Sequence, residues 1–322
     1  MKAVVQEGSG SADVLHLREV DEPDVTDDGV LVRVRAASVN AADWHTVRGG
    51  ALVRVIGRML RVRAVPIRGG DLAGVVEKTG KNVTHFKPGD EVYGAGPGSF
   101  AEFVAANEGR IALKPAGLSF EEAAAIPGAG CTALQGLRDH GHVQPGQRVL
   151  VYGAGGGVGT FAVQIAAALG GRVTAVTSTP NLEVVQSLGA AEVIDYTKDD
   201  VARRPDRYDV VFDVAATRPL ADMMRVLVPG GTYVLAGAAK GGAFAIVQRL
   251  AGVQLRSRLL HQRTANYLAR VNADDLAVLG QLVEADKLRP AIERTYPLNE
   301  TVEAVRYVGT GEARAKVVIA IA

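Results

Sequence analysis

The sequence is poor in cysteine, because its 322 residues include only Cys131. A single cysteine excludes disulfides within the chain and zinc sites built from several thiolates, and it is typical of a reducing cytoplasm. The net charge is only +1, so no overall attraction to nucleic acid or to an anionic membrane is expected. Long apolar runs and a secretory leader are also lacking, so we expect a cytoplasmic protein without integral membrane segments.

The first third of the chain has the pattern of a β-rich domain. Short runs rich in β-branched residues, separated by Gly- and Pro-containing turns such as Lys87-Pro88-Gly89-Asp90, predict strands. The predicted strands are Lys2–Gln6, Val30–Ala36, Asp71–Glu77, Glu91–Tyr93, Ala101–Ala105 and Ile111–Lys114. Many short strands of this kind indicate a small barrel or sandwich.

The pattern changes after Lys114. Ser119, followed by Glu121 and Glu122, is typical of a helix N-terminus. From Arg148 onward, strand-like and helix-like runs alternate, which predicts a parallel, doubly wound sheet. The elements after about Thr264, among them a helix and the final strand "AKVVIAIA", are too few for a third domain. We expect them to complete the first domain.

The strongest local signal is "VLVYGAGGGVGTFAVQIAAALG" (Val149–Gly170), a strand that leads through a Gly-rich turn into a helix. A G-x-G-x-x-G motif that starts at Gly153 would have Val158 in its last position and so does not match. The same spacing is present in Ala154-x-Gly156-x-x-Gly159, with alanine in place of the first glycine. Gly156 would let the backbone approach a pyrophosphate, and Gly159 would let the helix pack on the strand. We therefore expect a dinucleotide site, the alternative being a tight turn without a ligand.

The end of the next strand favours NADPH over NADH. A site for NADH usually carries Asp or Glu here, which binds the ribose diol. The strand instead ends in "VTSTPN", with Ser178, Thr179 and Asn181 but no acid. Neutral side chains avoid the repulsion that a carboxylate would exert on a 2′-phosphate. Arg203 and Arg204 could assist, although no pattern in the sequence places them at this site.

Several long segments together resemble the medium-chain dehydrogenase/reductase superfamily, specifically its zinc-independent quinone oxidoreductase branch. They are "AASVNAADWHTVRGG", "IRGGDLAGVVEKTGKNVTHFKPGDEVYG", "FAEFVAANEGRIALKPAGLSFEEAAAIPGAGCTALQGL", "VYGAGGGVGTFAVQIAAALG", "SLGAAEVIDYT" and "YPLNETVEAVRYVGTGEARAKVVI". The resemblance implies an α/β chain with a GroES-like β domain and a Rossmann domain that binds NADP(H) at their junction. The GroES-like catalytic domain would comprise residues 1–120 and 266–322, and the Rossmann domain residues 121–265.

The resemblance also implies a site without metal. Zinc-dependent relatives place their catalytic ligands at three positions, which read Asn40, Gly70 and Gly128 in this sequence. Zinc needs thiolate, imidazole or carboxylate ligands, and neither asparagine nor glycine supplies one. Asp43 and His45 would be an incomplete pair, so we expect no metal.

Without a Lewis acid, the expected reaction is hydride transfer from NADPH to an electron-poor carbon of a quinone or an α,β-unsaturated carbonyl compound. Hydrogen-bond donors would stabilise the charge that develops on the carbonyl oxygen. The resemblance places Asn40 near nicotinamide and substrate; the alternative is that Asn40 merely caps the following turn. Asp43 would orient its neighbours, and His45 or Tyr93 could donate the proton.

The expected cofactor contacts extend beyond the Gly-rich turn. The resemblance places Thr132 near the nicotinamide and Tyr196 on the adenosine side. The full expected set is Thr132, Ala154, Gly156, Gly157, Val158, Gly159, Ser178, Thr179, Asn181, Tyr196 and Gly237.

Other interpretations of the sequence stay open. A 2-enoyl-thioester reductase would carry a tyrosine shortly after the N-x-x-D loop, where "RGGALVRV" has none. A non-catalytic NADPH-binding or redox-sensing protein is the alternative from another class. The family resemblance suggests a homodimer, paired through edge strands around Val253–Leu260. The arginine-rich segment Leu52–Arg68 is either a solvated helix face or a flap over the substrate mouth.

Overall fold

The structure is a computed structural model that describes residues 1–49, 66–236 and 262–322. The chain divides into two compact units. Unit 1 comprises Met1–Cys131 with Val271–Ala322, and unit 2 comprises Thr132–Arg270. The sequence-based boundaries were 120/121 and 265/266. The first division falls later because helix α4 (Pro127–Leu134) runs across it, and a helix gives no turn signal in its interior.

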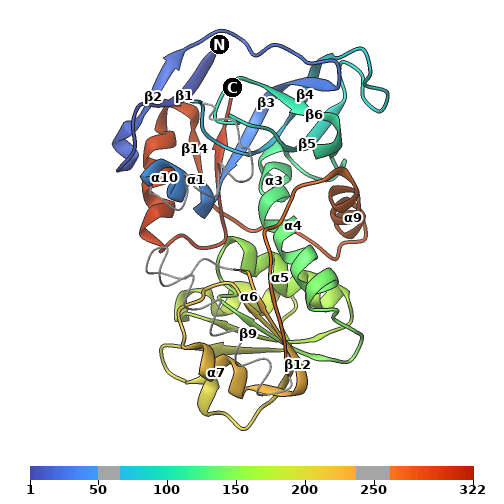
Figure 1. Ribbon diagram of the computed structural model, residues 1–322, viewed down its shortest axis with the longest axis vertical. Helices are drawn as coiled ribbons and strands as arrows, with labels where there is room; N and C mark the ends of the chain where they lie inside the picture. Colours follow the sequence, from blue (N-terminus) through green and yellow to red (C-terminus); the bar gives the residue numbers. More distant parts are fainter. Residues whose placement is uncertain (50–65, 237–261) are drawn as a thin grey trace. The chain divides into compact units, whose positions relative to one another are not determined.

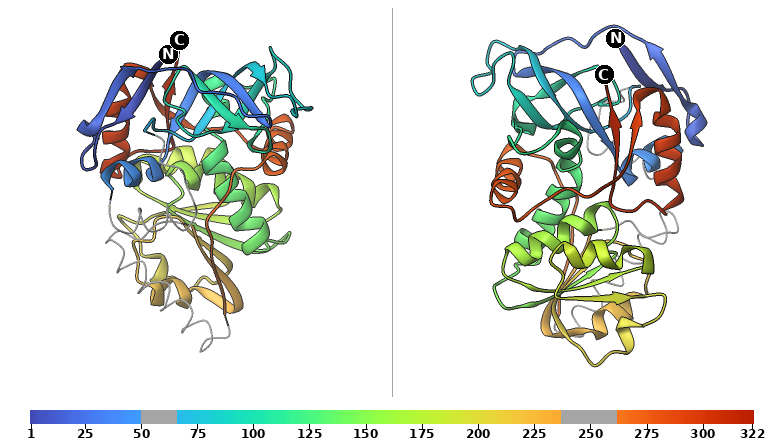
Figure 2. Two further views of the ribbon diagram at one scale, coloured as in Figure 1. Left: turned by 45° about the horizontal axis from the view of Figure 1, so that its top comes forward. Right: turned by 180° about the vertical axis from the view of Figure 1, so that it is seen from behind.

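Unit 1 is built on a seven-stranded sheet to which both ends of the chain contribute. The strand order is β14-β15-β3-β4-β5-β7, with β6 paired to β3. The C-terminal strands (red) run beside β3 (blue) in Figure 2, and Val318 of β15 lies opposite Ser38 of β3. The bounds are β3 (Gly29–Val39), β4 (Asp71–Thr79), β5 (Glu91–Ala95), β6 (Phe103–Asn107), β7 (Ile111–Leu113), β14 (Ile292–Pro297) and β15 (Lys316–Ala320).

A hairpin and several helices complete unit 1. The hairpin consists of β1 (Lys2–Gln6) and β2 (Leu15–Glu19). The helices are α1 (Ala41–Arg48), α3 (Phe120–Ala124), α9 (Ala273–Glu284) and α10 (Thr301–Thr310). Helix α1 lies beside α10 (Figure 1), and the ring of Trp44 packs so closely on Gly309 that a Cβ there would come within 2.6 Å of it. Trp44 is therefore partly buried and packs against the core of unit 1.

The predicted start of α3 is confirmed. The Ser119 hydroxyl accepts the backbone N–H of Glu122 at 3.2 Å, and the Glu122 carboxylate accepts the backbone N–H of Ser119 at 2.9 Å. This reciprocal capping satisfies two N–H groups that the first turn of a helix leaves without acceptors.

The predicted strands of unit 1 are present, although the bounds of several differ from the predicted ones. Strands β2 and β14 were not predicted. Strand β6 begins at Phe103 rather than at Ala101, because Ala101 forms an isolated bridge with Ala3 of β1 instead. The sequence could not show this pairing, since the two alanines are far apart in the chain.

Unit 2 is a six-stranded sheet in the order β10-β9-β8-β11-β12-β13, and all its neighbouring pairs are parallel. The expected doubly wound parallel sheet is therefore confirmed. The strands are β8 (Arg148–Tyr152), β9 (Arg172–Thr177), β10 (Glu192–Asp195), β11 (Tyr208–Asp213), β12 (Leu227–Leu235) and β13 (Arg263–Asn266). The helices include α5 (Gly157–Ala168), α6 (Leu182–Ser187) and α7 (Leu220–Arg225).

The strand order places a topological switch point beside β8. The chain leaves β8 for β9 and β10 on one side and returns to β11 on the other. In open α/β sheets, ligands bind at the carboxyl ends of the strands at such a point. The Gly-rich turn follows β8 directly, so the fold puts it where a ligand is expected. Within the described ranges, no helix has the length and apolar character needed to cross a membrane.

Candidate active site

The Gly-rich turn between β8 and α5 has the geometry of a phosphate cradle. A Cβ at Gly159 would lie 2.2 Å from the carbonyl oxygen of Gly153, so only glycine lets α5 pack this closely against the turn. A Cβ at Gly156 would meet nothing nearer than that same oxygen, at 3.7 Å. Gly159 is thus required by packing, whereas Gly156 borders open space.

The N-terminus of helix α5 carries partial positive charge, which would attract an anion at this turn. Gly156 is its N-cap, and the helix runs for twelve residues. The N–H groups of Gly157, Val158 and Gly159 occupy its first turn, where no acceptor within the helix is available. These groups and the helix dipole favour a phosphate at this position. The residues present therefore fit the pyrophosphate of a dinucleotide.

The structure brings Ser178 and Asn181 together beside this turn. The Asn181 amide donates to the Ser178 hydroxyl at 3.2 Å. A Cβ at Gly155 would lie 2.6 Å from the Asn181 amide nitrogen, so Gly155 lets Asn181 approach the Gly-rich turn. Tyr196, another expected contact on the adenosine side, is half exposed.

Asp195, at the end of β10, is an acid that sequence reasoning missed. Its carboxylate accepts hydrogen bonds from the hydroxyl groups of Thr179, at 2.5 Å, and Thr197, at 2.7 Å. These bonds, that of Thr179 foremost, lower the pKa of Asp195 to about 2. The carboxylate is therefore ionised at neutral pH, and the Thr179 proton is already engaged. The acid at the end of the predicted strand "EVIDY" was the available signal.

Arg203 and Arg204 are both engaged with carboxylates. Arg204 contacts Glu192, Asp199 and Asp206, and Arg203 lies 3.7 Å from Asp200. Neither shows a contact with the expected adenosine-side residues.

Of the remaining expected cofactor residues, Ala154 and Thr132 lie within the described part of the chain and Gly237 does not. Ala154 is buried in the Gly-rich turn, and the carbonyl of Thr132 on α4 accepts a hydrogen bond from the Tyr267 hydroxyl. Gly237 lies outside the described residues, as do the proposed dimer edge Val253–Leu260 and most of the arginine-rich segment.

In unit 1, Asn40 stands at the junction of β3 and α1. Its backbone is in the N-cap position, and its N–H donates to the Asp43 carboxylate at 2.7 Å. The side chain does more than cap the turn: Nδ2 donates to Asp71 at 2.8 Å, and Oδ1 accepts from the Lys316 ammonium at 2.6 Å. Asn40 is therefore held in a defined orientation by residues from β4 and β15.

Asp71 is the centre of this cluster. Besides Asn40, it accepts hydrogen bonds from the Ser38 hydroxyl and from the backbone N–H of Gly128, both at 3.1 Å, and it lies 3.9 Å from the Lys316 ammonium. The side chains of Asp71 and Lys316 are 5% and 3% exposed. Burial lowers the pKa of Lys316, and the charge of Asp71 opposes that shift.

The residues at the three zinc-ligand positions do not fit a metal. Asn40 and Gly128 both contact Asp71, and Gly70 precedes it in the chain. The carboxylates in contact with these residues are Asp71 and Asp43, and the Lys316 ammonium already lies beside Asp71. Across residues 1–49, 66–236 and 262–322, no group of three His, Cys, Asp or Glu side chains could hold a metal ion. The absence of metal stays a prediction from the ligand chemistry.

The other three expected catalytic residues, Asp43, His45 and Tyr93, have different environments. Burial raises the pKa of Asp43 to about 7, and the negative charge of Asp71 contributes to the rise. His45 is exposed on α1. Tyr93 is completely buried, and its hydroxyl donates to the Leu276 carbonyl at 2.6 Å; burial raises its pKa. These contacts give Tyr93 a structural role and argue against the expected proton transfer.

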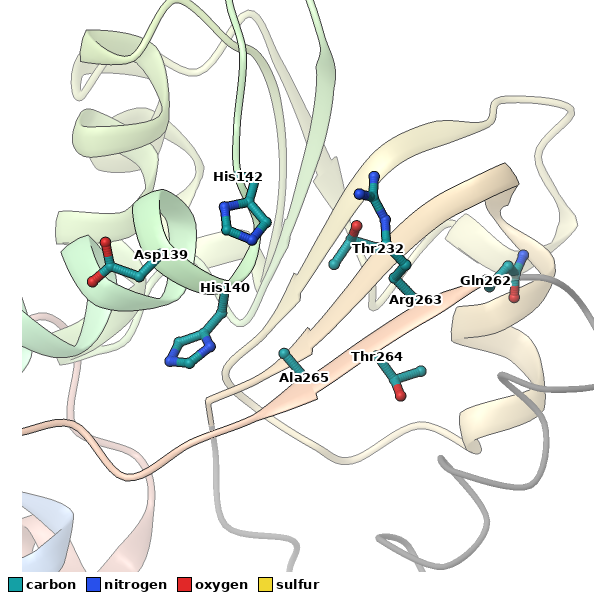
Figure 3. A pocket seen from close by; sticks show the side chains of 8 residues that line it. All are labelled: Asp139, His140, His142, Thr232, Gln262, Arg263, Thr264 and Ala265. Carbon is teal, nitrogen blue, oxygen red and sulfur yellow. The ribbon is translucent and has the colours of Figure 1, made fainter.

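Unit 2 contains a hollow, which Figure 3 shows with its lining residues. Its wall combines the end of η3 (Gln135–His140) with β12 and β13. The lining residues are Asp139, His140, His142, Thr232, Gln262, Arg263, Thr264 and Ala265. None of the expected cofactor or catalytic residues is among them, so we do not assign the reaction to this hollow.

Two family models match the chain. The model "Alcohol dehydrogenase GroES-like domain" matches residues 26–116, and "Zinc-binding dehydrogenase" matches residues 188–319. The second description mentions zinc, although the ligand positions in this chain are Asn40, Gly70 and Gly128. The expected combination of a GroES-like domain with a Rossmann sheet is confirmed.

Curated relatives are similar in sequence, and a solved structure is similar in fold, over nearly the whole length of this chain. The 2-methylene-furan-3-one reductase of Solanum lycopersicum is 36% identical, covering 99% of this chain and 79% of the relative. The chloroplastic NADPH-dependent alkenal/one oxidoreductase of Arabidopsis thaliana is 34% identical, with the same coverage. The quinone oxidoreductase from Coxiella burnetii has a TM-score of 0.87 at 30% identity, covering 100% of this chain and 99% of that chain.

Proposed function

Because the chain belongs to the medium-chain dehydrogenase/reductase superfamily, in its quinone oxidoreductase branch, we propose that it reduces quinones or α,β-unsaturated carbonyl compounds with NADPH. The observation that carries the proposal is the phosphate cradle at the start of α5. There Gly159 is required by packing, while Gly156 leaves room for a ligand.

NADPH is the cofactor that the proposal names. The N-terminus of α5 would hold the pyrophosphate, and Ser178 and Asn181 would face the 2′-phosphate with neutral groups. An alkenal/one oxidoreductase among the relatives is described as NADPH-dependent. Asp195 acts against this preference through its negative charge, so its hydrogen bonds to Thr179 and Thr197 matter for the choice between NADPH and NADH.

Asn40 is proposed to bind the carbonyl oxygen of the substrate. One of its two amide hydrogens is given to Asp71, and the second is left for a ligand. NADPH, when bound, supplies the hydride that adds to the electron-poor carbon. The negative charge then accumulates on the oxygen that Asn40 holds. A proton from His45 or Asp43 completes the reduction, so that NADPH, H⁺ and the enone give NADP⁺ and the saturated ketone.

A substrate panel tests this proposal. NADPH oxidation is followed with a quinone, a simple enone and a 2-enoyl-CoA, with and without a chelator. We expect turnover of the quinone or the enone, unaffected by the chelator. Turnover of the 2-enoyl-CoA alone would identify a thioester reductase. NADPH binding without turnover of any compound would identify a non-catalytic or redox-sensing protein.

A homodimer and a cytoplasmic location complete the proposal. Two chains of 33.7 kDa would give a particle of about 67 kDa, which light scattering after gel filtration measures. Some relatives are described as chloroplastic or mitochondrial, so the location is a separate question for imaging of the tagged full chain.

A further inference from the structure

Lys316 places a positive charge where the strand pattern favours an apolar residue. It opens β15, "KVVIA", whose next three residues are also buried. A buried ion pair such as Lys316–Asp71 gives little net stability, because the loss of hydration offsets the attraction between the charges. The pair therefore calls for an explanation beyond the stability of unit 1.

The pair determines which way round the Asn40 amide lies. Its oxygen is 2.6 Å from the ammonium, and its nitrogen is 2.8 Å from the Asp71 carboxylate. A reversed amide would place NH₂ against a cation and oxygen against an anion, which electrostatics disfavour strongly at these distances. The second N–H of Asn40 is thereby a donor of fixed direction.

Gly128 lies beside this donor, where a side chain would crowd both Asn40 and Asp71. A Cβ at Gly128 would lie 3.4 Å from Asn40 Nδ2 and 3.0 Å from both carboxylate oxygens of Asp71. The resemblance places a zinc ligand of zinc-dependent relatives at this position, where even a Cβ would press on Asp71 in this chain. The positive charge beside Asn40 comes from the ammonium of Lys316, while Arg68 is a second cation that acts on Asp43.

We propose that Lys316 is a positioning residue, which acts through Asn40 to fix and polarise the N–H donor for the carbonyl oxygen of the substrate. This inference rests on the proposed function, because that function makes the oxygen the partner of Asn40. The ammonium draws electron density toward Oδ1, so the remaining N–H becomes a stronger donor as negative charge builds up. Lys316 transfers no proton and touches no substrate.

A double-mutant cycle tests whether Lys316 acts through Asn40. Lys316→Met and Asn40→Ala are made singly and together, and kcat and KM are measured with the substrate that the panel identifies. We expect each single variant to lose about 10- to 100-fold in kcat with little change in KM or in NADPH affinity. The double variant should be no slower than the slower single variant. Losses that multiply, or a Lys316→Met enzyme as fast as wild type, would overturn the proposal.

Two further variants separate positioning from folding. Lys316→Met leaves Asp71 as a lone buried charge, so Asp71→Asn combined with Lys316→Met removes both charges; it should fold and still lose kcat. Lys114→Met is the matched control. Lys114 is another lysine of unit 1 with a 5% exposed side chain, and it bonds the Leu118 carbonyl at 2.6 Å and Glu91 at 3.1 Å. Its loss should lower the Tm and leave kcat unchanged.

A measurement without substrate separates this inference from the proposed function. In protein labelled with ¹⁵N-asparagine, the NH₂ signals of Asn40 are assigned by their disappearance in Asn40→Ala. We expect them to be shifted and slow to exchange in the wild type, and to lose both features in Lys316→Met. Unchanged signals would overturn the positioning role. Failure of the substrate panel would overturn the proposed function alone.

Discussion

At the residue scale, Asp43 combines a capping contact with an ionisation near neutral pH. Its carboxylate accepts the Asn40 N–H, while burial raises its pKa from 3.8 to about 7. Between these two pH values the folded chain keeps a proton that the unfolded chain has lost. The free energy of unfolding therefore falls as the pH rises through this window.

Asp43→Asn should remove this pH dependence, because asparagine still accepts the Asn40 N–H but cannot ionise. We expect the Tm of the variant, relative to wild type, to be higher at pH 8 than at pH 4.5 in thermal melts. Asp195→Asn is the control. The pKa of Asp195 is lowered to about 2, so the variant should lose a similar amount of Tm at both pH values. If the Tm difference between Asp43→Asn and the wild type were the same at pH 4.5 and at pH 8, the raised pKa of Asp43 would be contradicted.

His45→Gln tests the proton source. If the exposed imidazole donates the proton, the variant should lose kcat at neutral pH, by about 100-fold for a general acid, and its pH profile should flatten. Glutamine keeps the size and polarity of the side chain, so the Tm should stay the same. A kcat and pH profile equal to those of the wild type would make His45 a surface residue and leave Asp43 as the donor.

The sequence predicted some residues of the site and missed others for a physical reason. Gly156 and Gly159 belong to a local motif, in which the spacing itself expresses the geometry, and Asn40 was proposed from the family resemblance. Asp71 and Lys316 gain their roles from partners far along the chain, and Lys316 is 276 residues from Asn40. No local pattern encodes such a pair. The one available signal was a lysine at the start of an otherwise apolar strand.

At the scale of elements, the turn between β8 and α5 contains one glycine that we expect to matter for packing, Gly159, and one that we expect to matter for cofactor binding, Gly156. Gly159→Ala should cost about 1–3 kcal/mol or more in stability, because the new Cβ meets the Gly153 carbonyl. Gly156→Ala should leave the Tm near that of wild type and weaken NADPH roughly tenfold, or about 1.4 kcal/mol, since its methyl group enters the phosphate space.

Thermal melts and titration of NADPH fluorescence measure the two effects for both variants. Equal losses of Tm and affinity in the two variants would show that the turn is a packing feature only. Unchanged NADPH affinity in Gly156→Ala would move the pyrophosphate away from this turn.

The elements themselves were largely predictable, but their burial was not. The alternation of strands and helices after Arg148 gave the parallel sheet of unit 2. In unit 1, the strand Glu91–Tyr93 was predicted and Tyr93 was expected to reach the substrate, yet Val92, Tyr93 and Gly94 of β5 are all buried. A strand that is covered on both faces lacks the alternation that would have revealed this burial.

At the scale of the whole molecule, cofactor binding should stabilise the chain by mass action. NADPH at 100 times its Kd contributes about 2.7 kcal/mol, which calorimetry detects as a rise in Tm. We expect a smaller rise with the same concentration of NADH. A larger rise with NADH would overturn the preference for NADPH.

The fluorescence of the single tryptophan can report whether NADPH binding also stabilises unit 1. Trp44 is the only tryptophan of the chain and packs against the core of unit 1, whereas the proposed cofactor residues of the Gly-rich turn belong to unit 2. If tryptophan fluorescence follows the calorimetric shift, the two units unfold together. If it does not, unit 1 melts on its own.

The place of β15 beside β3 has a consequence for synthesis of the chain. Residues 132–270 form a continuous unit, which can fold soon after it leaves the ribosome. Unit 1 must wait for its last strand, and with it for the ammonium that holds Asn40. We therefore expect a newly made chain to form its proposed coenzyme site before the proposed donor for its substrate is oriented, so that reductase activity is among the last properties it acquires.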